Sequence, residues 1–202
     1  MMWPAPVFAG GKSCARPFSE EHLRSPEYLG WLHDYEVVRT LNLPSYWQPI
    51  SFERAAEYCR RLMASPNERF FALHEQANET FIGTLRIGHI DWLCETGDIG
   101  IMIGDRECWG QGFAKDAVRS AATYAFQELG LRRLTAGAMS INVPMIAVFE
   151  GLGFRREGCF RQHDRLREGG YCDHIFFGCF PGELGTPPAE GGVTNMSVGT
   201  KN

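Results

Sequence analysis

The spacing of apolar residues predicts a mixed helix and strand chain, most clearly near its middle. The isoleucines of residues 99–103 recur at period two, which is the spacing of a strand with one buried face. Apolar residues then recur at helical spacing over residues 114–129, until Gly130 supplies a helix stop. Gly110 and Gly112 lie between the segment with strand spacing and the segment with helix spacing. The middle of the chain is therefore predicted to be a strand, a glycine turn and a long helix.

Further elements of both kinds are expected on either side. Strands are predicted at residues 13–17, 69–74, 81–90 and 133–140, helices at 19–33, 52–63 and 143–152, and a closing hairpin at 156–180. Ser51 is the expected N-cap of the second helix. Helices between strands imply parallel pairing in the middle of the sheet, and hairpins imply antiparallel pairing at both ends. The predicted fold class is therefore α/β of the α+β kind, with a mixed central sheet flanked by helices.

Length and composition predict one domain. The 202 residues are 44% hydrophobic, which suits a single core of ordinary size. Residues 181–202 are rich in Gly, Pro, Thr and Ser and poor in apolar groups, so we expect a disordered tail there. We expect residues 1–11 to be a flexible N-terminus and residues 12–180 to form the domain.

Charge and cysteine usage favour a cytoplasmic protein that binds neither nucleic acid nor membranes. The formal net charge is -4, and no basic patch is interleaved with aromatic residues. The arginines of residues 155–167 leave two interpretations open, a solvated hairpin or an anion-binding role. The seven cysteines form no CxxC pair and no zinc-like spacing with histidine, so we expect reduced thiols and no metal site. The chain has no long apolar run and no cationic, apolar leader at its start.

The glycine turn is the feature that points to chemistry. The first turn of a helix has free backbone N–H groups and a partial positive charge, and glycines there let an anion approach the backbone. A dinucleotide fingerprint would need a third glycine where Lys115 stands, and the Gly-Lys-Ser/Thr of a Walker loop is absent. The turn therefore predicts a phosphate site of another kind. On glycine spacing alone, a purely structural turn is the alternative.

The turn and the segments around it match a known order of motifs. The loop over residues 107–114 reads Glu-Cys-Trp-Gly-Gln-Gly-Phe-Ala. Asn142, Leu152-Gly153-Phe154, Glu157-Gly158 and Tyr171-x-Asp173 follow it, and Leu29-x-Trp31-x-x-Asp34 precedes it. Together they resemble the GNAT superfamily of acetyl-CoA-dependent N-acetyltransferases, in particular its Rim-type branch, named for ribosomal-protein acetyltransferases. The resemblance covers residues 12–180 and implies the GNAT fold.

The resemblance implies acetyl-CoA as cosubstrate and assigns residues to it. The backbone N–H groups of Gln111, Gly112, Phe113 and Ala114 would hold the pyrophosphate, in a loop completed by Trp109 and Gly110. Ile101, Met102 and Ile103 would pair with the pantetheine amides in the manner of a strand. Asn142 would contact pantetheine or a water beside it while it caps the next helix. The alternative is that the two glycines serve packing alone.

The catalytic groups are assigned in the same way. Asp98 is the first choice for the proton acceptor, because Rim-type enzymes commonly carry a Glu there; its shorter side chain calls for a relayed water, and a solvent-facing strand start is the alternative. A backbone N–H near Met102 or Ile103 would stabilise the oxyanion. Many relatives carry a tyrosine acid where this chain has Phe149. Tyr171, a cysteine or water is left to protonate the thiolate.

The expected function is transfer of an acetyl group to a primary amine, by direct attack in a ternary complex. The acceptor would be a peptide or protein N-terminus, an amino sugar or another small-molecule amine, and a homodimer is left open. Candidate acceptor residues are Trp31, Tyr35, Trp47, His89 and Asp91, for which simple packing is the alternative. Two other functions stay open, a non-catalytic acyl-CoA-binding protein and a nucleotide-dependent oxidoreductase, and the missing third glycine argues against the second.

Overall fold

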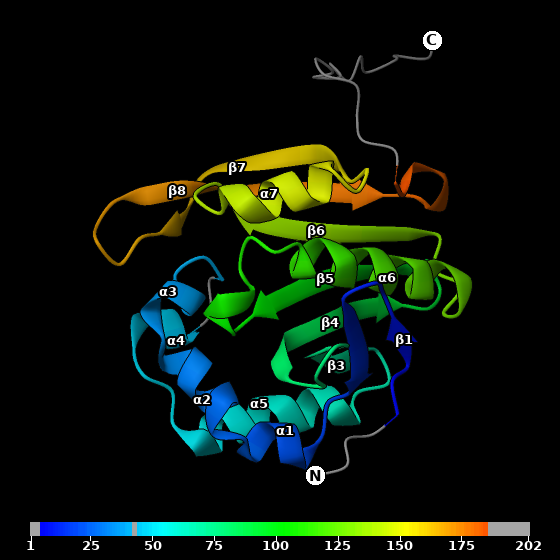
Figure 1. Cartoon of the computed structure of the whole chain (residues 1–202). Coiled ribbons are helices and arrows are strands. Elements are labelled where there is room, and N and C mark those ends of the chain that lie inside the picture. Colours follow the sequence, from blue (N-terminus) through cyan, green and yellow to red (C-terminus); the bar gives the residue numbers. More distant parts are fainter. Residues whose placement is uncertain (1–4, 42–43, 186–202) are drawn as a thin grey trace.

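An eight-stranded sheet runs through the centre of the molecule (Figure 1), in a computed structural model that describes residues 5–41 and 44–185. The strand order is β1-β2-β3-β4-β5-β6-β8-β7. The bounds are β1 Phe8–Ala9, β2 Ser13–Pro17, β3 Arg69–Glu75, β4 Phe81–Asp91, β5 Thr96–Ile103, β6 Arg133–Met139, β7 Arg155–Arg165 and β8 Tyr171–Cys179. Strands β5 and β6 pair in parallel, and the other neighbours in this order pair antiparallel. The predicted mixed sheet, parallel in the middle and antiparallel at both ends, is confirmed.

Helices cover both faces of this sheet (Figure 1). One face carries α6 Phe113–Gln127 and α7 Val143–Glu150; the other carries α1 Glu20–Arg24, α2 Pro26–His33, α3 Tyr35–Val38, α4 Pro44–Trp47 and α5 Phe52–Ala64. Short 3-10 turns occur at η1 Arg106–Cys108 and η2 Pro181–Glu183. The period-two pattern of β5 explains how the strand serves both layers. Its isoleucines pack in the cluster that contains α6, and Met102 packs in the cluster of the N-terminal helices.

The single helix expected over residues 19–33 is in fact two helices, α1 and α2. Pro26 is the first residue of α2, and a residue that precedes proline disfavours helical backbone angles. Ser25 is accordingly extended, with ψ 137°, and its hydroxyl accepts a hydrogen bond from the N–H of Tyr28 at 3.4 Å. The apolar pattern continues across this break, so periodicity alone does not reveal it. The predicted cap of α5 is confirmed, since the N–H of Arg54 donates to Ser51 Oγ at 3.4 Å.

The sheet begins earlier in the chain than composition predicts. The short strand β1 pairs with β2, and the Phe8 ring stacks on Tyr124 of α6 with centroids 5.0 Å apart. The following turn is fixed by Asp116, whose carboxylate accepts hydrogen bonds of 2.8 to 3.0 Å from the backbone N–H groups of residues 11–13. Part of the segment expected to be flexible therefore belongs to the domain. Residues 1–4 and most of the expected tail, 186–202, lie outside the described residues.

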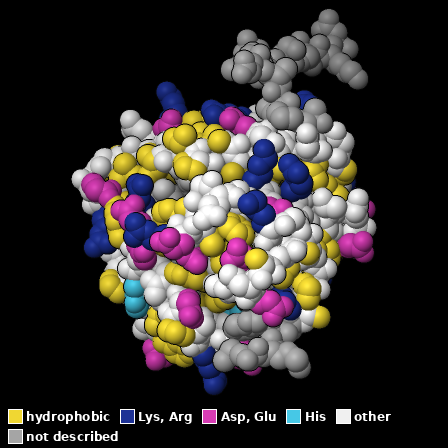
Figure 2. All heavy atoms as spheres, in the orientation of Figure 1, with side chains coloured by type: hydrophobic (Ala, Val, Ile, Leu, Met, Phe, Trp, Pro, Cys, Tyr) yellow, Lys and Arg dark blue, Asp and Glu magenta, His cyan; other side chains and the backbone are white. Residues whose placement is uncertain are grey.

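The surface carries charges of both signs. On the face shown in Figure 2, acidic and basic side chains are interspersed with apolar ones. Across the described ranges 5–41 and 44–185, no helix combines the length and the apolar character that crossing a membrane requires.

Candidate active site

Strands β5 and β6 separate after a short parallel ladder, and a cavity opens between them. The ladder contains three residue pairs and ends at Asp98↔Thr135. Beyond it lies a cavity of about 910 Å³, lined by residues 100–103 of β5 and 137–139 of β6, with α2, α3, α5, α6 and α7 forming its other walls. A parallel ladder that stops leaves backbone groups on the two facing edges free for a ligand.

Strand alternation decides which backbone groups of β5 face this opening. The N–H of Gly104 donates to the carbonyl of Ile82, on the β4 side, at 2.9 Å. Met102 lies two residues earlier in a regular register with β4, so its N–H points to β4 as well. The N–H groups of Ile101 and Ile103 point to the opening. Of the two residues expected near the oxyanion, Met102 therefore directs its N–H away from the opening and Ile103 directs its N–H toward it.

The glycine turn closes one end of the cavity. Gly110 and Gly112 adopt left-handed conformations, with φ 73° and 85°, and Gly112 is the N-cap of α6. Residues that have a Cβ rarely adopt such backbone angles, which explains why both positions are glycine. A Cβ at Gly112 would meet nothing closer than Lys12 Cε at 4.0 Å, so the space above the helix start is open. The turn is tied to β5 by Trp109, whose indole N–H donates to the carbonyl of Ile103 at 2.8 Å.

Most of the predicted coenzyme residues lie at this cavity. Its lining includes Ile101, Met102, Ile103, Trp109, Gly110, Gly112, Phe113, Ala114 and Asn142. Gln111 is the exception, because its side-chain amide folds back and donates to the carbonyl of Glu107 at 2.5 Å. Asn142 also caps α7 as predicted, since its Oδ1 accepts from the N–H of Met145 at 3.3 Å.

Asp98 lies beside the point where the strands separate, but it is not among the residues that line the cavity. The hydroxyl of Thr135 donates to its Oδ1 at 3.0 Å. Burial raises the pKa of the Asp98 carboxyl, although this hydrogen bond and the nearby His89 and Arg86 act in the opposite direction. A raised pKa suits a general base. To reach a substrate in the cavity, however, the carboxylate would need an intervening group.

Tyr171 does not lie at the cavity. It begins β8, in register with Arg165 near the hairpin tip, and its side chain is 61% exposed. The expectation that it protonates the thiolate is therefore not supported by its position. Phe149, which stands in the place of the usual tyrosine, is buried and does line the cavity.

The five predicted acceptor residues also lie outside the cavity lining. Trp31 packs on Phe81, with ring centroids 4.8 Å apart, and covers Gly104, where an added Cβ would clash with the indole. Tyr35 stacks on Tyr46, with centroids 6.0 Å apart. These aromatic side chains build the helical layer, as the packing alternative predicts.

The other three have surface or turn roles. Trp47 is 42% exposed, with the Arg165 guanidinium 5.6 Å from its ring centroid. The Nη2 of Arg86 lies 3.1 Å from Nε2 of His89. Asp91 accepts two hydrogen bonds of 2.9 Å from backbone N–H groups of the β4–β5 turn. This turn is at the opposite end of β5 from the glycine turn, which is why neither His89 nor Asp91 reaches the cavity.

Sequence reasoning missed most of the polar side chains that line the cavity. Among those missed are Arg39, Arg86, Lys115 and His174, which lie there together with Glu36. Arg86 forms an ion pair with Glu68 at 2.5 Å, and Arg39 forms one with Glu36 at 2.9 Å. A single charged residue in a strand or a short helix has no sequence signature. Strand pairing brings Arg86 and His174 to the cavity, and the packing of α3 and α6 brings Arg39 and Lys115 there.

His174 of β8 forms a close pair with Asp164 of β7. The distance from Nδ1 to Oδ2 is 2.7 Å, and Asp164 is 2% exposed. Because a carboxylate accepts, Nδ1 carries the hydrogen and Nε2 of the neutral ring is left as an acceptor. Nε2 lies over Gly137 of β6, where an added Cβ would come within 2.5 Å of it. The absence of a side chain at Gly137 gives the imidazole its place in the cavity wall.

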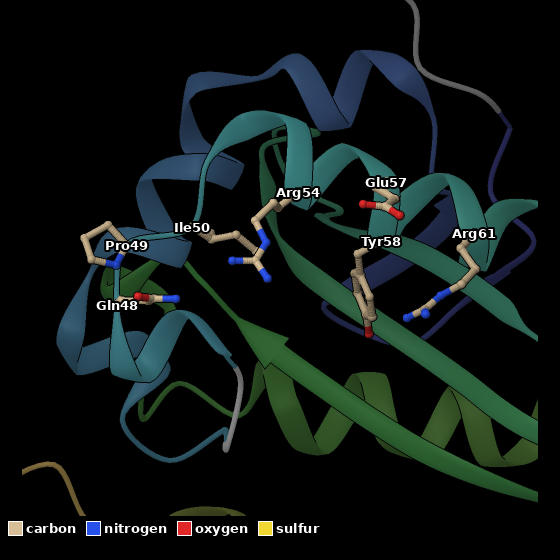
Figure 3. Close-up of a pocket in the computed structure, with 7 residues that line it drawn as sticks. All are labelled: Gln48, Pro49, Ile50, Arg54, Glu57, Tyr58 and Arg61. Atoms are coloured by element: carbon tan, nitrogen blue, oxygen red, sulfur yellow. The ribbon is translucent and has the colours of Figure 1, made fainter.

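A smaller hollow of about 210 Å³ adjoins the cavity and shares Ile50 and Tyr58 with it (Figure 3). Arg54, Tyr58 and Arg61 reach it from α5, and Gln48 and Pro49 bound it on the other side. Its lining includes neither the glycine turn nor the strand edges. The larger cavity is therefore the candidate active site.

Comparison with known proteins agrees with this geometry. Residues 14–155 match the family model described as acetyltransferase (GNAT) domain. The uncharacterized N-acetyltransferase p20 of Bacillus licheniformis is 27% identical over 134 residues, which cover 66% of this chain and 75% of the relative. The fold is similar to spermidine N-acetyltransferase from Vibrio cholerae in complex with CoA and spermine, with TM-score 0.75 and 20% identity over 85% of this chain and 96% of that one.

The fold is also similar to RimL, a ribosomal L7/L12 α-N-protein acetyltransferase in complex with coenzyme A. Here the TM-score is 0.75 and the identity 19%, over 87% of this chain and 98% of that one. The chain belongs to the GNAT family of acetyltransferases and is an acyltransferase of the N-acetyltransferase class.

Proposed function

We propose that this protein transfers the acetyl group of acetyl-CoA to a primary amine, by direct attack in a ternary complex. The preferred acceptor would carry one amino group. The main support is the cavity between β5 and β6. The glycine turn lies at one end of it, and the outward N–H groups of Ile101 and Ile103 lie along one side. This arrangement suits a long ligand with a phosphate at one end and amides along its length.

The pyrophosphate, the pantetheine and the thioester of the coenzyme would each have protein groups to bind them. The backbone N–H groups at the start of α6, from Gln111 to Ala114, would hold the pyrophosphate. The free edge of β5 would pair with the pantetheine amides. The N–H of Ile103 would donate to the thioester oxygen as negative charge develops there.

The charges of the cavity favour an acceptor with one amine. Among the described lining residues, Glu36 is the one carboxylate, whereas Arg39, Arg86 and Lys115 are cations. Glu36 is already paired with Arg39. A polyamine would need several carboxylates at successive ammonium groups. An amine with an apolar neighbour, such as the N-terminus of a peptide, fits these walls better than a polyamine or a polar amino sugar.

The test measures free thiol released from acetyl-CoA, with acetylated products identified by mass spectrometry. The acceptor panel contains short peptides with apolar first residues, glucosamine and spermidine. We expect saturable turnover with peptides and weaker turnover with spermidine. Saturable acetyl-CoA binding without acetylation of any acceptor would instead support a non-catalytic acyl-CoA-binding protein. Saturable NADH binding would support the oxidoreductase alternative.

A further inference from the structure

We propose that His174, held by Asp164, is the general base that takes the proton of the acceptor amine. The proposal rests on the acetyl transfer proposed above and adds a residue to it. Sequence reasoning gave this role to Asp98, which lies outside the cavity lining. His174 is part of that lining, and it lies on the same face of the sheet as Gly137 and Met139, whose backbones border the opening.

The first support is the tautomer of the His174 imidazole, which its contact with Asp164 fixes. The Asp164 carboxylate, 2.7 Å from Nδ1, fixes the tautomer in which Nε2 has a free lone pair. A buried carboxylate beside the ring also stabilises the imidazolium that forms when Nε2 takes a proton. Nε2 is the ring atom that lies over Gly137 at the cavity wall.

The second support is the backbone irregularity that places Asp164 beside His174. Strand β7 is in register with β8 at Phe160↔His174 and again at Asp164↔Cys172. Three residues of β7 therefore stand opposite one residue of β8. Within this bulge Gln162 adopts φ 51°, a conformation that few residues other than glycine adopt. Bulges that re-aim a side chain are common beside active sites, and an uninterrupted ladder would not bring the Asp164 carboxylate to Nδ1.

Two protons leave the acceptor nitrogen during the proposed reaction. The acceptor arrives as an ammonium, and Nε2 of His174 takes one proton from it. The freed lone pair attacks the thioester carbon, so that a carbon–nitrogen bond forms and the carbon–sulfur bond breaks, with its electron pair leaving on sulfur. A second proton passes from the former amine to the thiolate, which leaves as a thiol. The imidazolium then returns its proton to water.

Two ionisable side chains of the described residues have a direct side-chain contact with the imidazole. Asp164 is in contact with it, and the exposed His163 ring lies 5.8 Å away between centroids. Strand β6 offers Gly137 and Met139 on this side, which carry no charge. The charged groups elsewhere on the cavity wall are Glu36, Arg39, Arg86 and Lys115. A change in the pH profile that appears in His174→Gln and Asp164→Asn but not in His163→Gln can be assigned to the imidazole and its carboxylate partner.

The experiment measures kcat/KM against pH for His174→Gln, Asp164→Asn and Asp98→Asn, with the best amine found above. His163→Gln is the matched control, because it alters the same hairpin and the same ring contact without facing the cavity. Calorimetry with acetyl-CoA and circular dichroism check coenzyme binding and folding. We expect His174→Gln to lower kcat/KM by about 10²- to 10⁴-fold near neutral pH, with partial recovery at high pH, where the amine arrives deprotonated. Acetyl-CoA affinity should not change.

Further readouts separate a base from a structural residue. Wild type should lose activity toward acid pH, and that acid limb should vanish in His174→Gln but persist in Asp98→Asn. Added imidazole should restore part of the activity of His174→Ala, and Asp164→Asn should lose at least about 10-fold because the tautomer is no longer fixed. Near-normal turnover of His174→Gln, or equal losses in His174→Gln and His163→Gln, would overturn the proposal. If wild type acetylates no amine, the proposed function fails first and this step fails with it.

Discussion

Lowering the pH from 7.5 to 5 should destabilise the fold through one buried pair of histidines. The backbone N–H of Ser19 donates to Nδ1 of His22 at 3.1 Å, and Nδ1 of His74 lies 2.9 Å from the carbonyl of Glu79. The two Nε2 atoms are 3.0 Å apart, and both side chains are fully buried. An N–H can only donate and a carbonyl can only accept, so His22 carries its hydrogen on Nε2 and His74 on Nδ1. This chain of hydrogen bonds requires both rings to be neutral.

The magnitude follows from the shift of one group. Burial, with His74 and Arg16 nearby, lowers the pKa of His22 from 6.5 to about 3. The pKa of His74 is also lowered, chiefly by burial. A lowered histidine pKa gives stability that is complete above the unfolded value and is lost as pH falls toward the folded value. At pH 5 the unfolded chain binds almost one proton at His22 and the folded chain almost none, which costs about 2 kcal/mol relative to pH 7.5.

Urea unfolding followed by tryptophan fluorescence at both pH values measures this loss. His22→Gln removes the titrating ring, and the exposed His163→Gln is the control. The quantity compared is the change in unfolding free energy between the two pH values, so a uniform loss of stability in either variant does not affect the result. We expect His22→Gln to lose about 2 kcal/mol less than wild type and His163→Gln to match wild type. Equal losses in wild type and His22→Gln would refute the reasoning.

Three further outcomes are expected. Gly112→Val should weaken acetyl-CoA binding, measured by calorimetry, by at least about 10-fold. Valine disfavours the left-handed conformation at the start of α6, and its side chain would cover the N–H groups there. Gly182→Val, at an exposed glycine, is the control and should not change the affinity. Asp116→Ala should lower the unfolding free energy by about 2–3 kcal/mol, because the turn before β2 loses its acceptor; urea unfolding measures this. Native alkylation should modify Cys94 and Cys159, and the five buried cysteines should react only in denaturant, as mass spectrometry would show.

Local patterns predicted the parts of the site that depend on neighbouring residues in the chain. The isoleucines of β5, the glycine turn and the N-cap Asn142 form one short-range pattern each, and all three lie at the cavity. The break at Ser25 was also present in the sequence, in the proline that follows it. In contrast, the early strand β1 depends on the contact of Phe8 with Tyr124, more than a hundred residues away.

The acceptor side and the base could not be predicted in this way. Trp31 and Asp91 have residue types suited to a binding site, but the helical layer and a turn use them for other contacts. His174 and Asp164 meet because a bulge shifts the register of β7 against β8. Composition and periodicity do not encode the position of such a bulge, so this pair became visible only in three dimensions.

The short ladder between β5 and β6 also has a mechanical consequence. Three residue pairs join the half-sheet β1–β5 to the half-sheet β6, β8 and β7, whereas seven pairs join β4 to β5 and six join β6 to β8. Among the pairings from β2 to β7 in the sheet order, this seam has the fewest residue pairs, and we expect the two halves to twist against each other about it. A pantetheine chain bound along the seam would bridge the two half-sheets and restrict their motion relative to each other. Deuterium exchange at the N–H groups of Ile101 and Ile103 should then slow when acetyl-CoA binds, and the molecule as a whole should become stiffer as it is loaded.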